Sequence, residues 1–128
     1  MRLLLDTHLL LWAAAEPMKL SPEARDLIAA PENDLLFSAA SLWEVAIKTS
    51  LGRPDFRVDA GALRFGLVKA GYVELPIFAR HVVAVGGLPP LHKDPFDRLL
   101  VAQALTDGTT LLTSDAMVAA YPGPVRRV

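Results

Sequence analysis

Short apolar runs alternate with helical segments along the whole chain, and this alternation limits the possible folds more than any other feature. The runs lack the polar alternation of a half-exposed strand, so they are expected to be strands buried on both faces. Strands are expected at residues 3–5, 35–38, 72–75, 109–113 and 125–128, and helices at 7–15, 22–30, 41–52, 60–70, 77–85, 94–106 and 116–120. This order predicts an α/β fold with three α/β/α layers and a central, mainly parallel sheet of about five strands.

Length and composition favour a single domain spanning residues 1–128. The apolar content of 52% is too high for a disordered chain. There is no cysteine, which excludes disulfides, thiolate metal sites and thiol nucleophiles. The net charge of −1 provides no general basic field, so any binding of nucleic acid must be local or mediated by a metal.

The first fifteen residues have some features of a signal peptide, but their apolar stretch is interrupted by Asp6, Thr7 and His8. The remaining run, Leu9–Ala15, is too short for a signal peptide's apolar region with a cleavage site. It is also far short of the ~20 residues that span a bilayer. We therefore expect a strand and a helix inside the fold of a cytoplasmic protein with no membrane segment.

Four acidic residues are expected at one edge of the predicted sheet. Asp6 and Asp115 follow predicted strands, while Glu44 and Asp97 lie near the beginnings of helices. In parallel sheets, ligands bind at the carboxyl ends of the strands. Carboxylates gathered there repel one another unless a cation neutralises them, and oxygen ligands suit Mg²⁺ or Mn²⁺. Zinc is disfavoured because the three histidines show no paired spacing.

Each acid also has a structural interpretation. The two acids that follow strands would cap the next helix. Glu44 stands three residues after Ser41, as in a capping box, and four before Lys48, as in a helical ion pair. Asp97 lies in the first turn of a helix that Asp94 would cap, where the helix dipole stabilises it. The structural interpretation does not account for all four acids sharing one edge.

Four segments in order, LLLDTHLLLW, SAASLWEVAIKTSLG, LPPLHKDPFDRLLVAQAL and TLLTSDAMVAAY, resemble the PIN-domain ribonucleases. They resemble most the VapC-type toxins of type II toxin–antitoxin systems, over essentially the whole chain. The resemblance implies a metal-dependent endoribonuclease that uses Mg²⁺, with Mn²⁺ as the other candidate. A metal-activated water would attack the RNA phosphodiester in line and leave a 5′-phosphate and a 3′-hydroxyl. The implied acidic quartet is Asp6, Glu44, Asp97 and Asp115, with Asp6 and Asp97 as the principal metal ligands.

Further residues are expected in supporting or substrate-binding roles. The resemblance places Thr7 and Ser114 among the small hydroxyl residues that flank the acids. Asp94 is a candidate outer participant as well as a helix cap. Candidate substrate contacts, each with the alternative of a solvated or ion-paired charge, are Lys48, Arg53, Lys93, Arg98 and the loop histidine His92.

The remaining histidines and tryptophans have mainly structural interpretations. His8 is expected to pack or to donate to a carbonyl, and His81 to be half-buried on a helix. For Trp12 and Trp43, packing in the core or between subunits is favoured over base stacking, since their helical neighbours are apolar.

The resemblance also implies partners. VapC-type toxins usually form homodimers, and a cognate VapB-type antitoxin lays a segment into a groove near the acidic pocket. Candidate interface surfaces are Leu9–Trp12 and the helix that contains Trp43, although either can equally be core.

Two other functional classes with a similar α/β plan are disfavoured. Aspartate-based phosphatases need a second Asp two residues after the first, and position 8 is His. Receiver domains need a phosphoacceptor Asp where this chain has Ser38. The more serious alternative is a catalytically inactive PIN-fold module that binds RNA or protein, and the presence of all four acids argues against it.

Overall fold

The computed structural model describes every residue from Met1 to Val128. The strands are β1 (Arg2–Leu5), β2 (Asp34–Ser38), β3 (Val73–Leu75), β4 (Thr110–Thr113) and β5 (Val125–Arg127). The helices are α1 (Thr7–Ala15), α2 (Pro22–Ala29), α3 (Ala39–Ser50), α4 (Ala60–Lys69), α5 (Ala79–Val85), α6 (Pro95–Asp107) and α7 (Ala116–Ala119), with a 3-10 turn η1 (Pro17–Lys19) after α1. All strand pairs are parallel, and the order is β3-β2-β1-β4-β5.

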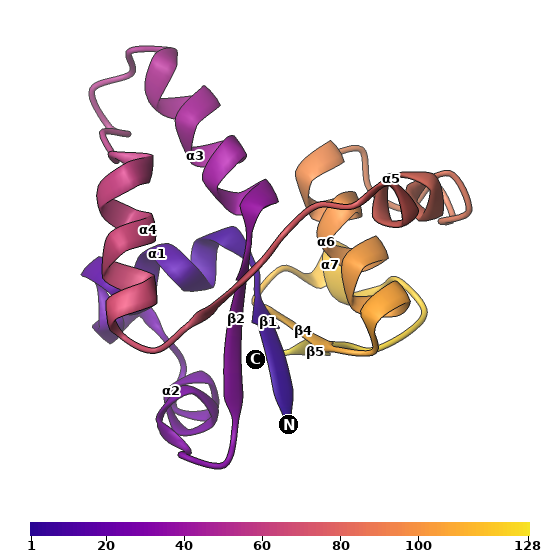
Figure 1. The fold of residues 1–128 in the computed structure, drawn as a ribbon, viewed down its shortest axis with the longest axis horizontal. Coiled ribbons are helices and arrows are strands. Elements are labelled where there is room, and N and C mark those ends of the chain that lie inside the picture. The colour runs from indigo at the N-terminus through magenta and orange to yellow at the C-terminus, as the bar shows by residue number, and fades with distance from the viewer.

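Helices cover both faces of this sheet, with α1, α2 and α4 on one side and α5, α6 and α7 on the other (Figure 1). Leu3 and Leu5 of β1 belong to one buried cluster with side chains of α1, α2 and α4. Leu4 belongs to a second cluster with side chains of α6 and α7. Since successive side chains of a strand point to opposite faces, β1 contributes to both cores. The predicted three-layer fold with a parallel sheet is confirmed.

The ends of α6 show how the local sequence sets an element. Asp94 caps the helix, and its Oδ1 accepts hydrogen bonds from the backbone N–H groups of Phe96 (2.9 Å) and Asp97 (3.0 Å). Pro95 occupies the first turn, where its missing N–H leaves no bond unmade. Gly108 ends the helix in the left-handed conformation, with φ of 67°, which a residue with a Cβ adopts only at a cost. The expected capping role of Asp94 is therefore present.

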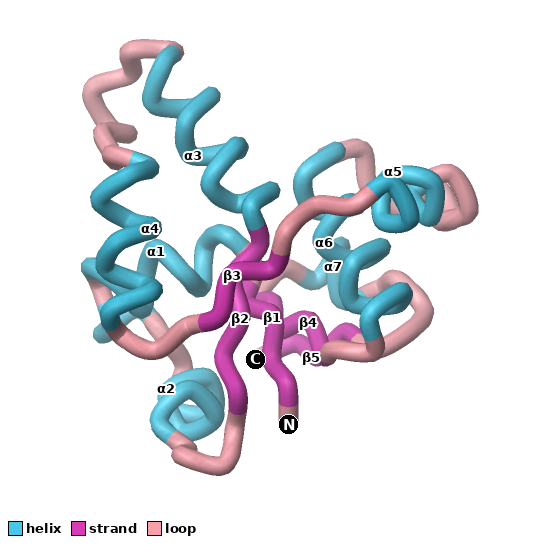
Figure 2. Tube along the Cα trace, in the orientation of Figure 1, coloured by secondary structure: helices cyan, strands magenta, loops and turns pink.

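The beginning of α3 differs from the sequence-based expectation. Ser41 was expected to cap this helix, but α3 continues directly from β2, and Ser38 is the cap (Figure 2). The Ser38 hydroxyl accepts a hydrogen bond from the Ala40 N–H at 3.0 Å. Ser41 is instead buried within the first turns of α3. A strand and a helix without a connecting loop left no turn signal in the sequence to mark the boundary.

Two buried polar side chains tie α6 to neighbouring segments. Gln103 of α6 accepts a hydrogen bond from the Ser38 hydroxyl (2.5 Å) and donates one to the Pro76 carbonyl (3.2 Å). His81 of α5 accepts from the Phe78 N–H (3.0 Å) and its Nε2 lies 3.0 Å from Asp107. His81 was expected to be half-buried but is fully buried, because α5 packs against α6.

None of the helices combines the length and apolar character that crossing a bilayer requires.

Replacing Gln103 with leucine tests whether this buried bridge supports the fold. The substitution Gln103→Leu keeps a side chain of similar size but leaves the Ser38 hydroxyl and the Pro76 carbonyl without their partner. We expect a loss of about 1–3 kcal/mol in the free energy of unfolding, measured by urea denaturation. Thr106→Ala, at an exposed position of the same helix, should change stability by less than about 0.5 kcal/mol. Equal stability of the two variants would contradict the role of the bridge.

Candidate acidic site at the carboxyl edge of the sheet

Asp6 and Asp115 are joined through a threonine that the sequence analysis did not single out. β1 and β4 are neighbours, with Leu5 opposite Leu112, so the residues that follow both strands lie at one edge. The Thr113 hydroxyl donates a hydrogen bond to Asp6 Oδ2 (2.6 Å) and accepts one from the Asp115 N–H (3.0 Å). Thr113 therefore links the two acids directly.

The Asp6 carboxylate is almost fully buried, at 3% exposure. Its Oδ1 accepts a hydrogen bond from the Leu9 N–H at 2.9 Å, which makes Asp6 the cap of α1. Burial raises the pKa of Asp6, the hydrogen bonds from Thr113 and Leu9 oppose this, and the nearby charge of Asp115 raises the pKa further. The Asp6 carboxylate therefore caps α1 and also interacts with the charge of Asp115.

Glu44 is also 3% exposed, and its two carboxylate oxygens have different surroundings. Oε2 pairs with the Lys48 ammonium at 2.5 Å, one helical turn away. Oε1 is buried and has no hydrogen-bond partner. The neighbouring turn is fixed by a buried hydrogen bond of 2.9 Å from the Thr7 hydroxyl of α1 to the Ser41 hydroxyl of α3. An orphaned buried carboxylate oxygen is costly unless a ligand satisfies it.

Asp97 lies in the first turn of α6, and its Oδ2 is 2.9 Å from Nε2 of His92. The pKa of Asp97 is raised to about 6, first by burial and then by the charge of Asp94, while the hydrogen bond with His92 opposes the shift. The charges of Glu44 and Asp6 raise the pKa of Asp97 further. Three of the predicted acids therefore share one electrostatic environment.

This arrangement suits a divalent cation with a preference for oxygen ligands. The donors are carboxylates from four separate segments, and one of the buried oxygens, Glu44 Oε1, has no partner within the protein. Mg²⁺ and Mn²⁺ accept such oxygen ligands and keep several waters. The one group of three or more possible ligand residues whose ligand atoms lie within 4.8 Å of one another is His92, Asp94 and Asp97, so Asp97 is the only one of the four predicted acids in it. The oxygen chemistry of the acids thus fits the expected metal, while the compact arrangement of possible ligand atoms lies around Asp97 and does not extend over all four acids.

The other predicted site residues differ in burial and in hydrogen bonding. Thr7 is at the site and is buried. Ser114 is half-buried and its hydroxyl makes no hydrogen bond within the protein, whereas its neighbour Thr113 donates to Asp6. A role for Ser114 toward a metal-bound water or a phosphate stays a prediction. Thr113 is the last residue of its strand, and only strand pairing shows that its side chain reaches Asp6. Asp115 is exposed and caps α7 by accepting from the Met117 N–H at 2.8 Å.

The charged candidates for substrate contact divide into two groups. Lys48 is paired with Glu44, and the Arg98 guanidinium is bound to backbone carbonyls and to a tyrosine hydroxyl. Arg53 and Lys93 are exposed to solvent. Sequence proximity to the acids therefore did not distinguish charges used within the fold from charges that remain available.

The aromatic side chains differ in how far they are exposed to solvent. Trp12 is half-buried and packs against one core cluster, as expected. Trp43, for which packing in the core or between subunits was favoured, is 54% exposed, so it is not part of the core of this chain. Its ring meets the edge of Phe96 at a centroid distance of 4.9 Å. His8 is exposed, and its ring centroid is 6.1 Å from that of Trp12.

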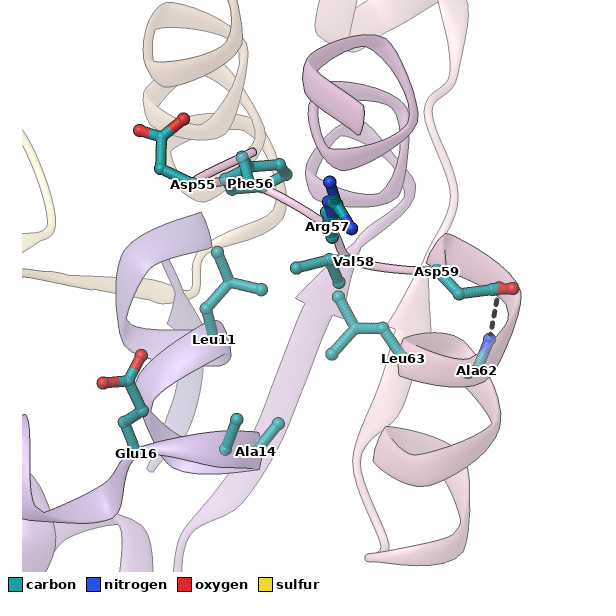
Figure 3. A pocket seen from close by; sticks show the side chains of 11 residues that line it. Leu11, Ala14, Glu16, Asp55, Phe56, Arg57, Val58, Asp59, Ala62 and Leu63 are labelled. Atoms are coloured by element: carbon teal, nitrogen blue, oxygen red, sulfur yellow. Dashed lines mark hydrogen bonds between the residues drawn. The ribbon is translucent and has the colours of Figure 1, made fainter. Parts of the chain in front are cut away.

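The largest cavity lies away from the acids, between α1, the segment 55–59 and the beginning of α4 (Figure 3). Its volume is about 450 Å³. Apolar side chains of Leu11, Phe56, Val58 and Leu63 point toward it, and Glu16 lies at one end. This groove is open to solvent, and charged side chains of Glu16, Asp55, Arg57 and Asp59 stand among its apolar lining.

A parallel α/β/α sheet with acidic residues gathered at its carboxyl edge defines the general class of protein. A family model described as the PIN domain matches residues 3–124. The chain therefore belongs to the PIN-domain family, whose members are typically nucleases that use divalent metal ions. No curated protein sequence matches the chain.

Solved structures share the fold at low sequence identity. VapBC2 from Rickettsia felis, bound to a DNA fragment from its promoter, has 17% identity and a TM-score of 0.72, covering 99% of this chain and 98% of that one. A toxin–antitoxin complex from Klebsiella pneumoniae has 18% identity and a TM-score of 0.61, with 98% of each chain covered. VapBC-1 from nontypeable Haemophilus influenzae has 20% identity and a TM-score of 0.57, covering 90% of this chain and 87% of that one.

The raised pKa of Asp97 predicts how stability depends on pH. The pKa is about 6 in the folded protein against an ordinary value of 3.8, so the folded state binds more protons between these values. Its contribution to stability is therefore greatest below about pH 4 and is lost as the pH rises through about 6. Asp97→Asn cannot ionise and should be more stable than the wild type at pH 8, by on the order of 2 kcal/mol after allowance for partial exposure.

The measurement is urea denaturation in EDTA at pH 4 and pH 8, with the metal-free wild type as reference. Asp26→Asn, at an exposed position of α2, is the matched control and should show no such dependence. The gain of Asp97→Asn should disappear at pH 4. An equal gain at both pH values would show that ionisation of Asp97 is not its cause.

Proposed function

We propose that the protein is a metal-dependent endoribonuclease of the VapC toxin type, with Asp6, Glu44, Asp97 and Asp115 forming its catalytic site. The observation that carries this proposal is the buried, unpartnered Oε1 of Glu44 in the same environment as Asp6 and Asp97. A protein with no ligand for this site would hold an unsatisfied oxygen and repelling charges at one edge for no gain.

The protein's own side chains prepare the site in distinct ways. We propose that Asp6 and Asp97 hold the cation, with Glu44 and Asp115 completing the site directly or through water. Once bound, Mg²⁺ or Mn²⁺ would neutralise charge on the phosphate and make a water more acidic. Thr113 orients Asp6 by its hydrogen bond, and His92 orients Asp97. The pathway requires no side-chain nucleophile.

Substrate binding would rely on few basic residues, because the net charge is −1. Arg98 and Lys48 are engaged within the fold, which leaves Lys93 and Arg53 as the candidate phosphate contacts. Lys93 directly follows His92, so it lies next to the acidic site along the chain. A cation at the site would supply the attraction for RNA that the surface charge does not.

Removal of either principal acid should abolish cleavage of RNA. Asp6→Asn and Asp97→Asn each remove a charge that the proposed metal requires, so we expect the rate to fall about 10²-fold or more, the scale for losing one preorganised electrostatic group. Cleavage of total RNA is measured with Mg²⁺, with Mn²⁺ and with EDTA. Asp26→Asn is the matched control and should cleave at the wild-type rate.

The outcomes separate the proposed enzyme from its alternative. Metal-dependent cleavage that both variants lose supports the nuclease. Cleavage that persists in both variants would mean that the site lies elsewhere. A wild-type protein free of any bound inhibitor that cleaves none of several RNA classes, yet binds one of them, would favour the inactive binding module.

We further propose that the partners are a second copy of the chain and a cognate VapB-type antitoxin. The similar structures include VapBC and other toxin–antitoxin complexes. The groove of Figure 3 has an apolar lining that suits the side chains of an antitoxin segment, and it includes Leu11 from the predicted interface Leu9–Trp12. It lies away from the acidic pocket, so this proposal differs from the expected groove beside the acids. Exposed apolar side chains on α5, Val82 and Val83, are candidates for the contact between copies.

A charged side chain placed in the groove should weaken antitoxin binding without affecting catalysis. Ala14 lines the groove and is exposed, so Ala14→Arg can fill the groove without opening the core. We expect at least about a tenfold rise in the dissociation constant, about 1.4 kcal/mol, since the arginine side chain would occupy space that the antitoxin segment needs. Calorimetric titration with the antitoxin measures it, and Ala29→Arg, at an exposed position of α2, is the control. Unchanged affinity in Ala14→Arg would place the antitoxin on another surface.

A further inference from the structure

The segment between α5 and α6, residues 86–94, is held by an arginine of α6. Arg98 Nη1 donates hydrogen bonds to the carbonyls of Pro89 (3.0 Å) and His92 (3.5 Å), and Nη2 donates to the Val85 carbonyl (3.2 Å). A guanidinium presents its donors in a rigid planar fork, so several carbonyls bound at once constrain the whole segment. Arg98 thus acts on the shape of this loop.

Tyr121, which follows α7, holds the same segment through its hydroxyl. It is 3% exposed, and its ring belongs to the second core cluster. Its hydroxyl accepts hydrogen bonds from the His92 N–H (3.0 Å) and from Arg98 Nη1 (2.9 Å). It also lies 3.2 Å from the His92 carbonyl, to which it donates its own proton. Since a hydroxyl has one donor and two acceptor sites, this group is fully used.

The contacts of Tyr121 and Arg98 with this segment affect the position of His92 and, through it, Asp97. Both backbone polar groups of His92 are bound to Tyr121, and this placement brings its Nε2 to 2.9 Å from Asp97 Oδ2. No other side chain hydrogen-bonds the Asp97 carboxylate. The orientation of that carboxylate therefore depends on a loop whose position is set by Tyr121 and Arg98.

We propose that Tyr121 and Arg98 are positioning residues that hold His92 in place and thereby fix the orientation of the Asp97 carboxylate. Neither residue needs to touch the substrate or the cation. The effect on metal affinity rests on the proposed function of the acidic site. In known metal sites, loss of a group that orients a ligand weakens metal binding or activity by about 10–100-fold.

The hydrogen bond between His92 and Asp97 can be tested without metal or substrate. In NMR spectra at neutral pH, a hydrogen-bonded His92 Nε2–H should give a protected, downfield imidazole proton. Tyr121→Phe keeps the buried ring and removes only the hydroxyl, so this signal should be lost or shifted. Tyr72→Phe changes another buried tyrosine, in the opposite core cluster, and should leave it unchanged. An unaltered signal in Tyr121→Phe would overturn the proposal.

Metal affinity provides the second readout. Binding of Mn²⁺ alone, followed by electron paramagnetic resonance, should weaken about tenfold in Tyr121→Phe and remain within about twofold of wild type in Tyr72→Phe. His92→Ala should weaken binding by at least as much, and His92→Gln, which keeps an N–H donor near the Nε2 position, should recover part of the loss. Thermal melting of each variant separates these effects from unfolding.

A double-mutant cycle decides whether Tyr121 acts through His92. In the His92→Ala background, adding Tyr121→Phe should weaken Mn²⁺ binding no further. If the double variant lost Mn²⁺ affinity by the product of the two single losses, the two residues would act independently, and the proposal would be overturned. If the wild type binds no Mn²⁺ and cleaves no RNA, the proposed function fails, while the NMR comparison still decides whether Tyr121 positions His92.

Discussion

The pairing of β1 with strands on both of its sides is the constraint on which the rest of the structure depends. β1 lies between β2 and β4, and its residues Leu3, Leu4 and Leu5 are fully buried. Because its side chains alternate between the two faces, the same short strand contributes to both cores. Its carboxyl end therefore lies at the middle of the sheet edge, and Asp6 is the next residue along the chain. The position of the first acid is a direct result of the position of the strand.

The acidic site concentrates unfavourable electrostatics within a protein in which most other buried polar side chains have partners, the hydroxyl of Thr109 being the exception. Burial raises the pKa of Asp6 and Asp97, and their neighbours at the site are further acids. Elsewhere, buried polar side chains such as Gln103 and His81 have partners for their hydrogen bonds. Buried polar groups without hydrogen-bond partners are common where a ligand binds, and their cost in folding free energy is offset by the stability of the rest of the fold. The contrast within this one chain is the physical argument for a ligand at the acidic edge.

Much of the architecture could be predicted from the sequence because the signals were local. The cap at Asp94, Pro95 in the first turn and Gly108 after the helix mark α6 without any reference to tertiary contacts. The predicted beginning of α3 was wrong although the end of β2 at Ser38 was right, since Ser38 and Ser41 are both good caps and no local signal shows that the helix follows the strand without a loop. The expected roles of the four acids stay a prediction, although the structure gives those roles a shared environment.

By itself, the sequence determined the alternation of strands and helices, the parallel sheet and the positions along the chain from which acids reach one edge. These follow from the apolar periodicity and from helix-capping residues, which act over a few residues. Only the tertiary structure decided that Thr113 and not Ser114 binds Asp6, that Arg98 serves the loop and not the surface, and that Tyr121 reaches His92. Such contacts join residues far apart in the chain. They depend on strand register and helix packing, and no local pattern of residues encodes either of these.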